Sequence, residues 1–498
     1  MENSLQERLG AYAASGALPF HMPGHKRNLD AAPFLASLGG GLDITEVDGF
    51  DDLHHARGVL KEEMDRAAAL WGAERTFFLV NGSSCGLLSA IWALGMGGGR
   101  AVVARNCHKS VYHGLELCGL TVRWLRPHWC GPLGIWGSIP PVVVEEALEE
   151  IPDARFVLIT SPTYDGVLSD IASIAALCHR RGVPLIVDEA HGAHLGFFGF
   201  PDGAVKLGAD LVVQSAHKTL PSLTQTALLH VGGSGLVDAA GVERALSIFE
   251  SSSPSYLLLA SLSGCVRWLE SPGALSPWQR GLAAFDRGIE DLTRLYAAGR
   301  GRAAGESYPG VFGWDPSKIL IFGRNGFVLM DELRERFGVE LEQAQPHYAL
   351  ALTGAGDDER SLTRLARALC VLDGESANSP PGSGADFSDV HTPTPAPGAS
   401  IPGPCLLGAP FSPPPDIPPA RLEPREALAA PWEALPLGQA AGRVCAQYLG
   451  VYPPGIPLAV PGEELTPALL KQLADLVDEG AELRMSPAGT PGTVRVVL

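Results

Sequence analysis

Two apolar segments of the sequence each end beside a charged residue that could do chemistry. The segment 183–187 is followed by Asp188, and the segment 209–213 is followed at a short distance by Lys218. Both segments have the length and composition of fully buried parallel strands, and polar residues at the ends of such strands line a crevice. A carboxylate that pairs with a pyridinium nitrogen and a lysine that forms an imine are the protein groups that pyridoxal 5'-phosphate (PLP) needs. Asp188 and Lys218 therefore predict a PLP site.

A turn of small residues supplies a candidate phosphate site. Residues 81–86 (Asn-Gly-Ser-Ser-Cys-Gly) connect a predicted strand, 76–80, to a predicted apolar helix, 87–94. The start of a helix presents unpaired backbone N–H groups, and a small-residue turn lets an anion approach them. We expect Ser83 and Ser84 to contribute hydroxyl groups to this site.

Two of these motifs also fit other kinds of active site. Gly82 to Gly86 fits G-x-S-x-G, the nucleophile turn of α/β serine hydrolases, with Ser84 as nucleophile. That reading leaves the segment around Lys218 unexplained. His191 and His194 with Asp188 have the composition of an iron or zinc site, but no further residue of the stretch supports a metal, and we predict none.

The elements that must position these residues alternate regularly between strands and helices along the chain. Further strands are predicted over 101–104 and 156–160, and a helix over 171–180. Such alternation predicts a doubly wound α/β domain with its crevice at the carboxyl ends of the strands. We place this domain at residues 45–265. His108, just after the strand 101–104, could stack on a flat cofactor there.

The remaining chain divides by composition. Residues 1–44 form an N-terminal arm that begins with a short helix, and residues 266–373 form a smaller α+β domain that begins with a long helical stretch over 272–300. Residues 374–418 are rich in Pro, Ser, Gly and Ala and predict a flexible linker. Residues 419–498 form a C-terminal α+β domain, in which we expect a helix over 437–449.

Bulk composition excludes several classes of function. The 498 residues carry a net charge of −18, which argues against nucleic acid as a partner, and 46% of them are hydrophobic, which suffices for sizeable cores. No apolar run reaches membrane-spanning length, and the N-terminus has no signal-peptide core. Nine scattered cysteines suit free thiols in a reducing compartment. We therefore expect a cytoplasmic protein.

Together, these stretches resemble the Orn/Lys/Arg decarboxylase family of PLP-dependent enzymes, and most closely its shorter bacterial members, which lack a receiver-like N-terminal domain. The chain departs from the family in its long linker and at Ser263, where members often carry an acidic residue. The resemblance rests on the segments 20–26, 81–84, 108–110, 160–164, 188–194, 214–221, 252–256, 452–457 and 461–463.

The resemblance implies an aspartate-aminotransferase-like large domain with a mixed, mostly parallel sheet, a smaller α+β domain and a C-terminal α+β domain. It implies that Lys218 carries PLP, that Asp188 pairs with the pyridine nitrogen, that His108 stacks on the ring and that His191 supports the ring or Asp188. Phosphate contacts are expected from Ser83, Ser84, Ser215 and His217.

The implied reaction is decarboxylation of arginine, lysine or ornithine to agmatine, cadaverine or putrescine plus CO2, in a homodimer or a larger homo-oligomer. Candidate carboxylates for the distal cation of the substrate are Asp43, Glu46, Asp48 and Glu463, which the sequence does not rank. Another PLP reaction on the same fold, by an aminotransferase or an aldolase, and a non-catalytic homologue are the alternatives.

Overall fold

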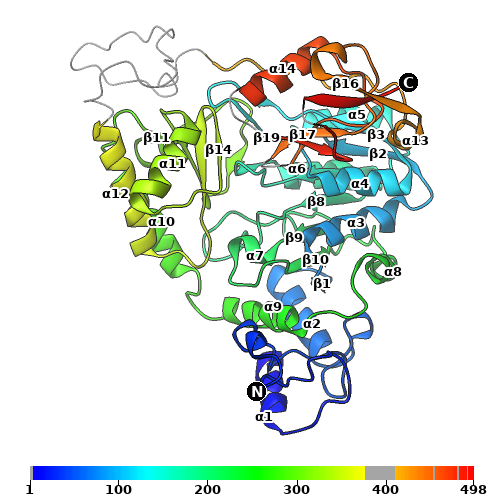
Figure 1. Cartoon of the computed structure of the whole chain (residues 1–498), viewed down its shortest axis with the longest axis vertical. Coiled ribbons are helices and arrows are strands. Elements are labelled where there is room, and N and C mark those ends of the chain that lie inside the picture. The colour runs from blue at the N-terminus through cyan, green and yellow to red at the C-terminus, as the bar shows by residue number, and fades with distance from the viewer. Residues whose placement is uncertain (1–3, 376–409, 453–454, 479–481, 491) are drawn as a thin grey trace.

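The computed structural model describes residues 4–375, 410–452, 455–478, 482–490 and 492–498 (Figure 1). Its centre is a seven-stranded sheet in the order β1-β10-β9-β8-β6-β2-β3. The strands from β9 to β3 run parallel, whereas β10 is antiparallel to both of its neighbours. The sheet is therefore mixed and mostly parallel, as the resemblance implies. Its strands are β1 (Arg75–Leu79), β2 (Gly99–Ala104), β3 (Leu120–Leu125), β6 (Val157–Thr160), β8 (Leu185–Asp188), β9 (Leu211–Gln214) and β10 (Ala227–Val231).

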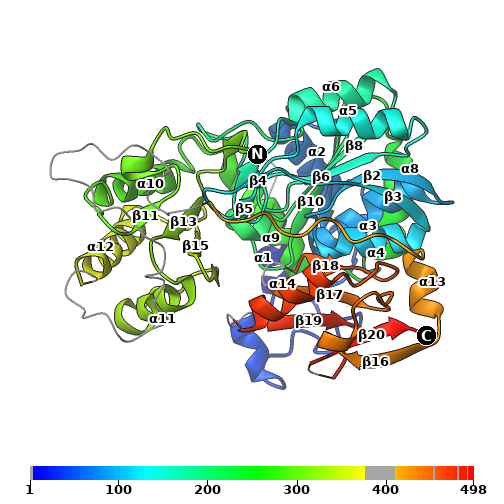
Figure 2. The same cartoon turned by 90° about the horizontal axis from the view of Figure 1, so that it is seen from above.

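Helices cover both faces of this sheet, which explains why its strands are continuously apolar. Successive residues of β8 alternate between the two faces: Ile186 packs in one core, and Leu185 and Val187 pack in the other. Figure 2 shows α3 and α4 on one side of the sheet and α5 and α6 on the other. The helices of the large domain are α3 (Gly82–Gly95), α4 (Lys109–Cys118), α5 (Pro141–Glu150), α6 (Ile171–Arg180), α7 (Ala216–Thr219), α8 (Ala239–Phe249) and α9 (Tyr256–Leu269).

The N-terminal arm begins with α1 (Leu5–Ala14), as expected, and α2 (Val59–Trp71) follows it. A capping box at Ser4 and Glu7 defines the first turn of α1. Leu5 and Leu9 of α1 and Leu60 of α2 share one core with α9. This packing fixes the arm to the lower part of the molecule as Figure 1 draws it.

A smaller α+β domain lies beside the sheet (Figure 1). Its four-stranded antiparallel sheet has the order β11-β13-β15-β14. The two-stranded pair β12·β7 joins it to the large domain, because β7 (Val167–Leu168) belongs to the large domain and β12 (Gly313–Trp314) to the small one. The other elements are α10 (Ser276–Gly288), β11 (Tyr296–Ala297), β13 (Lys318–Phe322), α11 (Gly326–Phe337), β14 (Gln343–Gln345), β15 (Tyr348–Leu352) and α12 (Glu359–Glu375).

The long helical stretch expected over 272–300 is wrong in its second half. Helix α10 ends at Gly288, and the carboxylate of Asp373 then accepts hydrogen bonds from the backbone N–H groups of Thr293, Arg294 and Leu295 at 2.9, 2.7 and 2.6 Å. Backbone donors bound in this way are not available to a helix. The chain therefore leaves the helical path and enters β11.

The C-terminal domain packs over the α4 side of the large sheet, where Tyr448 and Val460 join the core of α3 and α4. The helix expected over 437–449 is wrong. Only a single 3-10 turn, Leu437–Gln439, forms, and Gly442 has a φ of 77°, which ends any helical continuation. The domain contains α13 (Pro424–Ala429), β16 (Trp432–Pro436), β17 (Tyr448–Tyr452), β18 (Pro457–Ala459), α14 (Pro467–Asp478), β19 (Glu482–Ser486) and β20 (Thr493–Val497).

Most of the predicted linker lies outside the described residues. Its described end, 410–418, lies along the large domain. There the indole N–H of Trp129 donates to the carbonyl of Phe411 at 2.9 Å, and the N–H of Phe411 donates to the carbonyl of Gly131 at 2.9 Å. The described end of the linker is thus tied to the large domain by hydrogen bonds.

Candidate active site

A cavity of about 600 Å³ lies where β8 and β9 end and α3 and α4 begin. Because the strands between β9 and β2 are parallel, their carboxyl ends meet at one edge of the sheet, and their terminal polar residues converge there. Eight of the residues expected at the site line this one cavity. The full lining is Gly82, Ser83, Ser84, Leu87, Asn106, His108, Thr160, Tyr164, Asp188, Ala190, His191, Ser215, His217, Lys218, Glu342, Leu352 and Ile456.

Lys218 lies on α7 and faces His191. Its Nζ is 3.0 Å from His191 Nε2. Burial lowers the pKa of Lys218, an effect that the charge of Asp188 opposes. Burial, followed by the positive charge of Lys218, holds the pKa of His191 well below its ordinary value. The histidine is therefore neutral, and its Nε2 accepts the hydrogen bond from the lysine.

Asp188 is the last residue of β8 and is almost fully buried. The N–H of Ala190 donates to its Oδ1 at 3.2 Å. Burial raises the pKa of Asp188, and the charge of Lys218 opposes the shift. A buried carboxylate that has an amine as its nearest charge is suited to stabilise a second cation, such as a protonated ring nitrogen, in the same cavity.

The predicted phosphate turn is shorter than expected: α3 begins at Gly82, so residues 82–86 form its first turn and the helix begins before residue 87. Asn81, the residue before α3, makes no side-chain hydrogen bond to the helix, so the first backbone N–H groups of α3 are left to a ligand. The Ser215 hydroxyl lies 2.9 Å from that of Ser83, which joins the start of α7 to the start of α3. Nearby, His217 Nδ1 donates to the carbonyl of Thr226 at 2.8 Å.

His108 is the N-cap residue of α4. Its Nδ1 lies 2.8 Å from the hydroxyl of Ser110 and accepts from the Ser110 N–H at 3.3 Å, which fixes the orientation of the ring. Burial, with Lys218 and Lys109 as further causes, lowers the pKa of His108 to about 4. A neutral imidazole wall of this kind suits a flat aromatic ligand.

Several buried polar atoms of the cavity wall have no protein partner among the described residues: Asn106 Oδ1, Thr160 Oγ1 and His191 Nδ1. Buried polar groups are normally hydrogen-bonded, so these atoms indicate a polar ligand. With Asp188, Lys218 and the start of α3, the donor set fits PLP, which has a ring nitrogen, a ring oxygen, an aldehyde and a phosphate.

The four acids proposed for the distal cation of the substrate are not among the described residues that line this cavity. Asp43 lies 3.2 Å from His25 Nε2, and Glu463 forms a buried ion pair with Arg105 at 2.9 Å. Ser263 is a residue of α9, and its hydroxyl donates to Glu63 of α2 at 3.0 Å.

The structure adds residues that sequence reasoning missed as site residues: Asn106, Thr160, Tyr164 and Glu342. Asn106 and Thr160 stand at or just beyond strand ends, which is the signal that identified Asp188. Glu342 lies in the small domain, and no local pattern marks it.

The alternative readings of the same residues are not supported. Among the described residues, no hydrogen bond joins Ser84 to a histidine, as a hydrolase triad requires, because His108 is held by Ser110 and His191 faces Lys218. His194 points away from His191 and binds Asp315 at 2.9 Å. The two histidines of the alternative metal site therefore face different partners.

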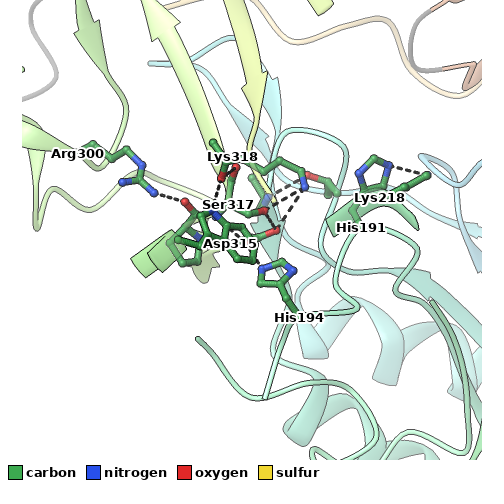
Figure 3. Close-up of polar contacts among 12 residues, drawn as sticks. His191, His194, Lys218, Arg300, Asp315, Ser317 and Lys318 are labelled. Carbon is green, nitrogen blue, oxygen red and sulfur yellow. Dashed lines mark hydrogen bonds and ion pairs between the residues drawn. The ribbon is translucent and has the colours of Figure 1, made fainter. Parts of the chain in front are cut away.

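Figure 3 shows a second group of polar side chains, which includes His194 and Asp315 and joins the two domains. His194 comes from the large domain, and Asp315, Ser317 and Lys318 come from the small one. Asp315 Oδ2 accepts from the Ser317 hydroxyl at 2.7 Å and lies 3.4 Å from Lys318 Nζ. The side chains of His194, Asp315 and Lys318 are fully buried. Despite burial, the charges of His194 and Lys318 hold the pKa of Asp315 well below its ordinary value.

Two sequence profiles match this chain. The profile described as "Orn/Lys/Arg decarboxylase, major domain" matches residues 4–284, and the profile of the C-terminal domain of the same family matches residues 415–478. The chain belongs to the Orn/Lys/Arg decarboxylase family. The family is PLP-dependent, so the cofactor that the cavity fits is the one its members use.

Relatives across the full length support this assignment. The arginine decarboxylase of Halalkalibacterium halodurans is 32% identical over 507 residues, which cover 98% of this chain and 96% of that protein. The arginine decarboxylase of Bacillus subtilis is 32% identical over 510 residues, which cover 100% of this chain and 98% of that protein. A lysine decarboxylase of Pseudomonas aeruginosa is 29% identical over 285 residues, 53% of this chain and 37% of that protein.

The fold agrees with solved structures. The constitutive lysine decarboxylase of Escherichia coli has a TM-score of 0.77 and 22% identity, and the match covers 99% of this chain and 82% of that one. The aspartate-aminotransferase-like fold expected from the sequence is thus confirmed. This member of the family is a PLP-dependent amino-acid decarboxylase, a carboxy-lyase that acts on basic amino acids. Among the described residues, no helix combines the length and apolar character needed to cross a membrane.

Proposed function

We propose that this decarboxylase converts arginine to agmatine and CO2, with PLP carried on Lys218. The observation that carries the proposal is the convergence of half-buried Lys218 and buried Asp188 on one cavity. Arginine is favoured over lysine because the two relatives described above that match this chain over nearly its whole length at 32% identity are named arginine decarboxylases. Agmatine is in turn a starting material for polyamine formation.

Each residue of the cavity has a part in the proposed reaction. PLP, when bound, supplies an electron-withdrawing ring that accepts the electron pair left when CO2 departs. Asp188 holds a proton on the ring nitrogen and so keeps the ring electron-withdrawing. Lys218, whose amine burial makes easier to deprotonate, binds the cofactor and afterwards delivers a proton to the substrate carbon. His191 accepts a hydrogen bond from Lys218 and orients its amine.

The other residues would bind and orient the cofactor. Ser83, Ser84, Ser215 and His217, with the start of α3, would hold the phosphate, and His108 would lie against the ring. The same cavity excludes much of the bulk water from the reacting atoms, because its deep wall is built from Asp188, Ala190 and His191, all of which are buried. Exclusion of water strengthens each of these electrostatic contacts.

The test is product identification with arginine, lysine and ornithine, each with and without added PLP. We expect agmatine and CO2 in equal amounts from arginine, and slower turnover of the two ammonium substrates. A keto acid formed without CO2 would establish transamination instead. Faster release of CO2 from lysine or ornithine than from arginine would contradict the substrate assignment.

We further propose that the protein is a homodimer in the cytoplasm. The N-terminal arm exposes large apolar side chains close together in sequence, and a monomer has no evident use for them. They are Leu18, Phe20, Met22, Phe34 and Leu38, with exposed fractions of 81%, 94%, 61%, 71% and 66%. The described cysteines are all free thiols, as a reducing compartment requires.

Light scattering coupled to size-exclusion chromatography tests the dimer. We expect twice the chain mass for the native protein and a shift towards the monomer for Phe20→Asp combined with Phe34→Asp. Val142→Asp is the control, because Val142 is an exposed apolar residue on α5, away from the arm. A native protein that elutes as a monomer contradicts the proposal.

We also propose the domain limits expected from the sequence: 1–44, 45–265, 266–373 and 419–498, with 374–418 as the connection. The separate hydrophobic core of the C-terminal part, which includes Leu449, Leu473 and Val496, supports the last of these units. Limited proteolysis that cuts first within 374–418 would support the connection. A first cut inside one of the proposed domains would contradict it.

A further inference from the structure

Glu342 is the second carboxylate on the described wall of the cavity that contains Lys218 and Asp188. It stands immediately before β14 in the small domain, and its backbone N–H donates to the carbonyl of Leu350 at 3.0 Å. The main chain at Glu342 is therefore held against β15. Its side chain is free of that strand pairing and reaches the cavity.

Tyr164 fixes the carboxylate of Glu342. The Tyr164 hydroxyl donates to Glu342 Oε1 at 2.5 Å. The Tyr164 ring meets the His191 ring edge-on, with centroids 4.8 Å apart and planes at 62°. His191 in turn contacts Lys218. A continuous series of contacts thus leads from the lysine that carries the cofactor to a carboxylate on the small domain.

The space beside Glu342 accommodates an extended side chain. A second recess, of about 520 Å³, adjoins the first cavity, and Lys218, Glu342 and Leu352 line both. Glu342 therefore stands at the junction of the two spaces. A substrate whose reacting carbon lies beside Lys218 can extend its side chain along this junction.

We infer that Glu342, oriented by Tyr164, binds the guanidinium group of the substrate. This inference rests on the proposed arginine decarboxylation. A guanidinium group and a carboxylate form two parallel hydrogen bonds, and such charge-assisted pairs are stronger than neutral ones. Asp188 is committed to the ring nitrogen, and the other acids that line the two spaces have partners: Glu340 pairs with Arg334, and Asp357 accepts from the Ser361 hydroxyl at 2.9 Å. Glu342 is therefore the carboxylate left for a cationic side chain on the described wall of the two spaces. Burial lowers the pKa of Lys218, and the charge of Glu342 partly opposes that shift, which agrees with a position close to the reacting groups.

The contacts of the sequence-derived candidates explain why they do not take this role. Glu463 is neutralised by Arg105, and its Oε2 also accepts from the Val460 N–H at 2.9 Å. Asp43 is paired with His25. By contrast, Glu342 forms no ion pair with any described residue, and its carboxylate accepts from the neutral hydroxyl of Tyr164. Its charge acts on buried Lys318 without forming an ion pair with it, so the carboxylate is available to a ligand.

The test compares Glu342→Gln, Glu342→Asp and Tyr164→Phe with the native enzyme. Glu335→Gln is the control, since Glu335 lies exposed on α11 in the same domain and outside both cavities. Steady-state kinetics with arginine give kcat and KM, and calorimetry gives the affinity for agmatine, which carries the guanidinium but no carboxylate. The visible absorbance of bound PLP verifies that each variant is folded and loaded.

For Glu342→Gln we expect KM for arginine and Kd for agmatine to rise together by about 30- to 100-fold, with kcat changed by less than about 5-fold, because binding rather than chemistry is lost. Glu342→Asp and Tyr164→Phe should raise both constants by about 3- to 10-fold, because they misplace the carboxylate without removing it. Glu335→Gln should leave both unchanged.

A Glu342→Gln enzyme with native KM and native agmatine affinity overturns the inference. So does one that loses kcat while agmatine binding stays intact, since Glu342 would then act at the reacting carbon. If Glu342→Gln fails to bind PLP, Glu342→Asp and Tyr164→Phe decide by the same criterion. A native enzyme that does not release CO2 from arginine refutes the proposed function itself, and agmatine binding in the variants then reports on Glu342 separately.

Discussion

The amine of Lys218 lies 3.0 Å from Nε2 of His191. His191 is buried and Lys218 half-buried, and burial, followed by the positive charge of the lysine, lowers the pKa of the histidine and keeps it neutral. A neutral imidazole can accept a hydrogen bond from the amine in either of its protonation states. The pair therefore provides an acceptor that persists while Lys218 gains and loses protons during turnover.

Replacement of His191 by Phe should retain the ring contact with Tyr164 and remove the acceptor. We expect kcat to fall by about 100- to 1000-fold, as for loss of a positioned proton-transfer partner, with PLP still bound. Stopped-flow decarboxylation and the absorbance of the bound cofactor measure the two effects. His55→Gln, at an exposed position, is the matched control. An unchanged kcat in His191→Phe would show that the contact has no part in turnover.

Asp188 and Glu189 are adjacent buried acids, and we expect neutral substitutions to lower kcat strongly at Asp188 but hardly at Glu189. Asp188→Asn removes the charge that holds the ring nitrogen protonated, so kcat should fall by about 100- to 1000-fold. Burial raises the pKa of Glu189 to about 8, and its oxygens accept from Gln214 Nε2 at 2.6 Å and the Ala204 N–H at 2.8 Å. At neutral pH Glu189 is thus mostly uncharged.

Glu189→Gln, which is close to isosteric and neutral, should consequently keep kcat within about 3-fold of native. Steady-state kinetics on PLP-saturated enzyme compare the two variants. Equal losses in both would indicate that burial of any acid at this strand end, and not the charge of Asp188, supports the reaction.

The buried ion pair between Asp315 and Lys318 should contribute to the unfolding free energy of the protein. Asp315→Asn would remove the ion-pair partner of buried Lys318, and breaking such a pair costs about 3–5 kcal/mol of unfolding free energy. Urea unfolding monitored by tryptophan fluorescence measures the loss. The double variant Asp315→Asn with Lys318→Met should recover part of it, because the stranded charge is gone. A double variant no more stable than Asp315→Asn would contradict this electrostatic account.

Acid should destabilise the protein through its buried neutral histidines. Burial lowers the pKa of His230 from 6.5 to about 3, so the unfolded chain binds a proton at pH values where the folded chain does not. Stability is therefore lost as the pH falls from the unfolded pKa towards the folded one, and His230 alone contributes about 2 kcal/mol of loss between about pH 7 and pH 5.

Urea unfolding at both pH values measures this loss. His230→Gln removes packing against Trp71 at either pH, but the difference in unfolding free energy between the two pH values should shrink by about 2 kcal/mol. The same difference in native and variant protein would mean that His230 already titrates normally in the folded state.

The sequence by itself determined the reaction class and identified eight residues that line one cavity. Asp188, Lys218, His108 and the serine turn lie at strand ends or helix starts, and a parallel sheet brings such positions together whatever the details of packing. Local pattern also determined α6, predicted over 171–180, whose buried residues Ile171, Ile174, Ala175 and Cys178 recur with the helical period. It was wrong at 437–449, because glycines with permissive backbone and long-range strand pairing override a short apolar pattern.

Only the tertiary structure decided which groups meet across the two domains. Tyr164 and Glu342 are 178 positions apart, and His194 and Asp315 are 121 apart. No periodicity or motif encodes such contacts, because they depend on how the small sheet docks on the large one. The same docking brought Glu342 to the cavity, whereas Asp43 is paired with His25 inside the N-terminal arm and Glu463 of the C-terminal domain is paired with Arg105 of the large domain. The proposed substrate-facing wall is therefore a property of the domain arrangement, whereas the proposed cofactor-facing wall is a property of strand order.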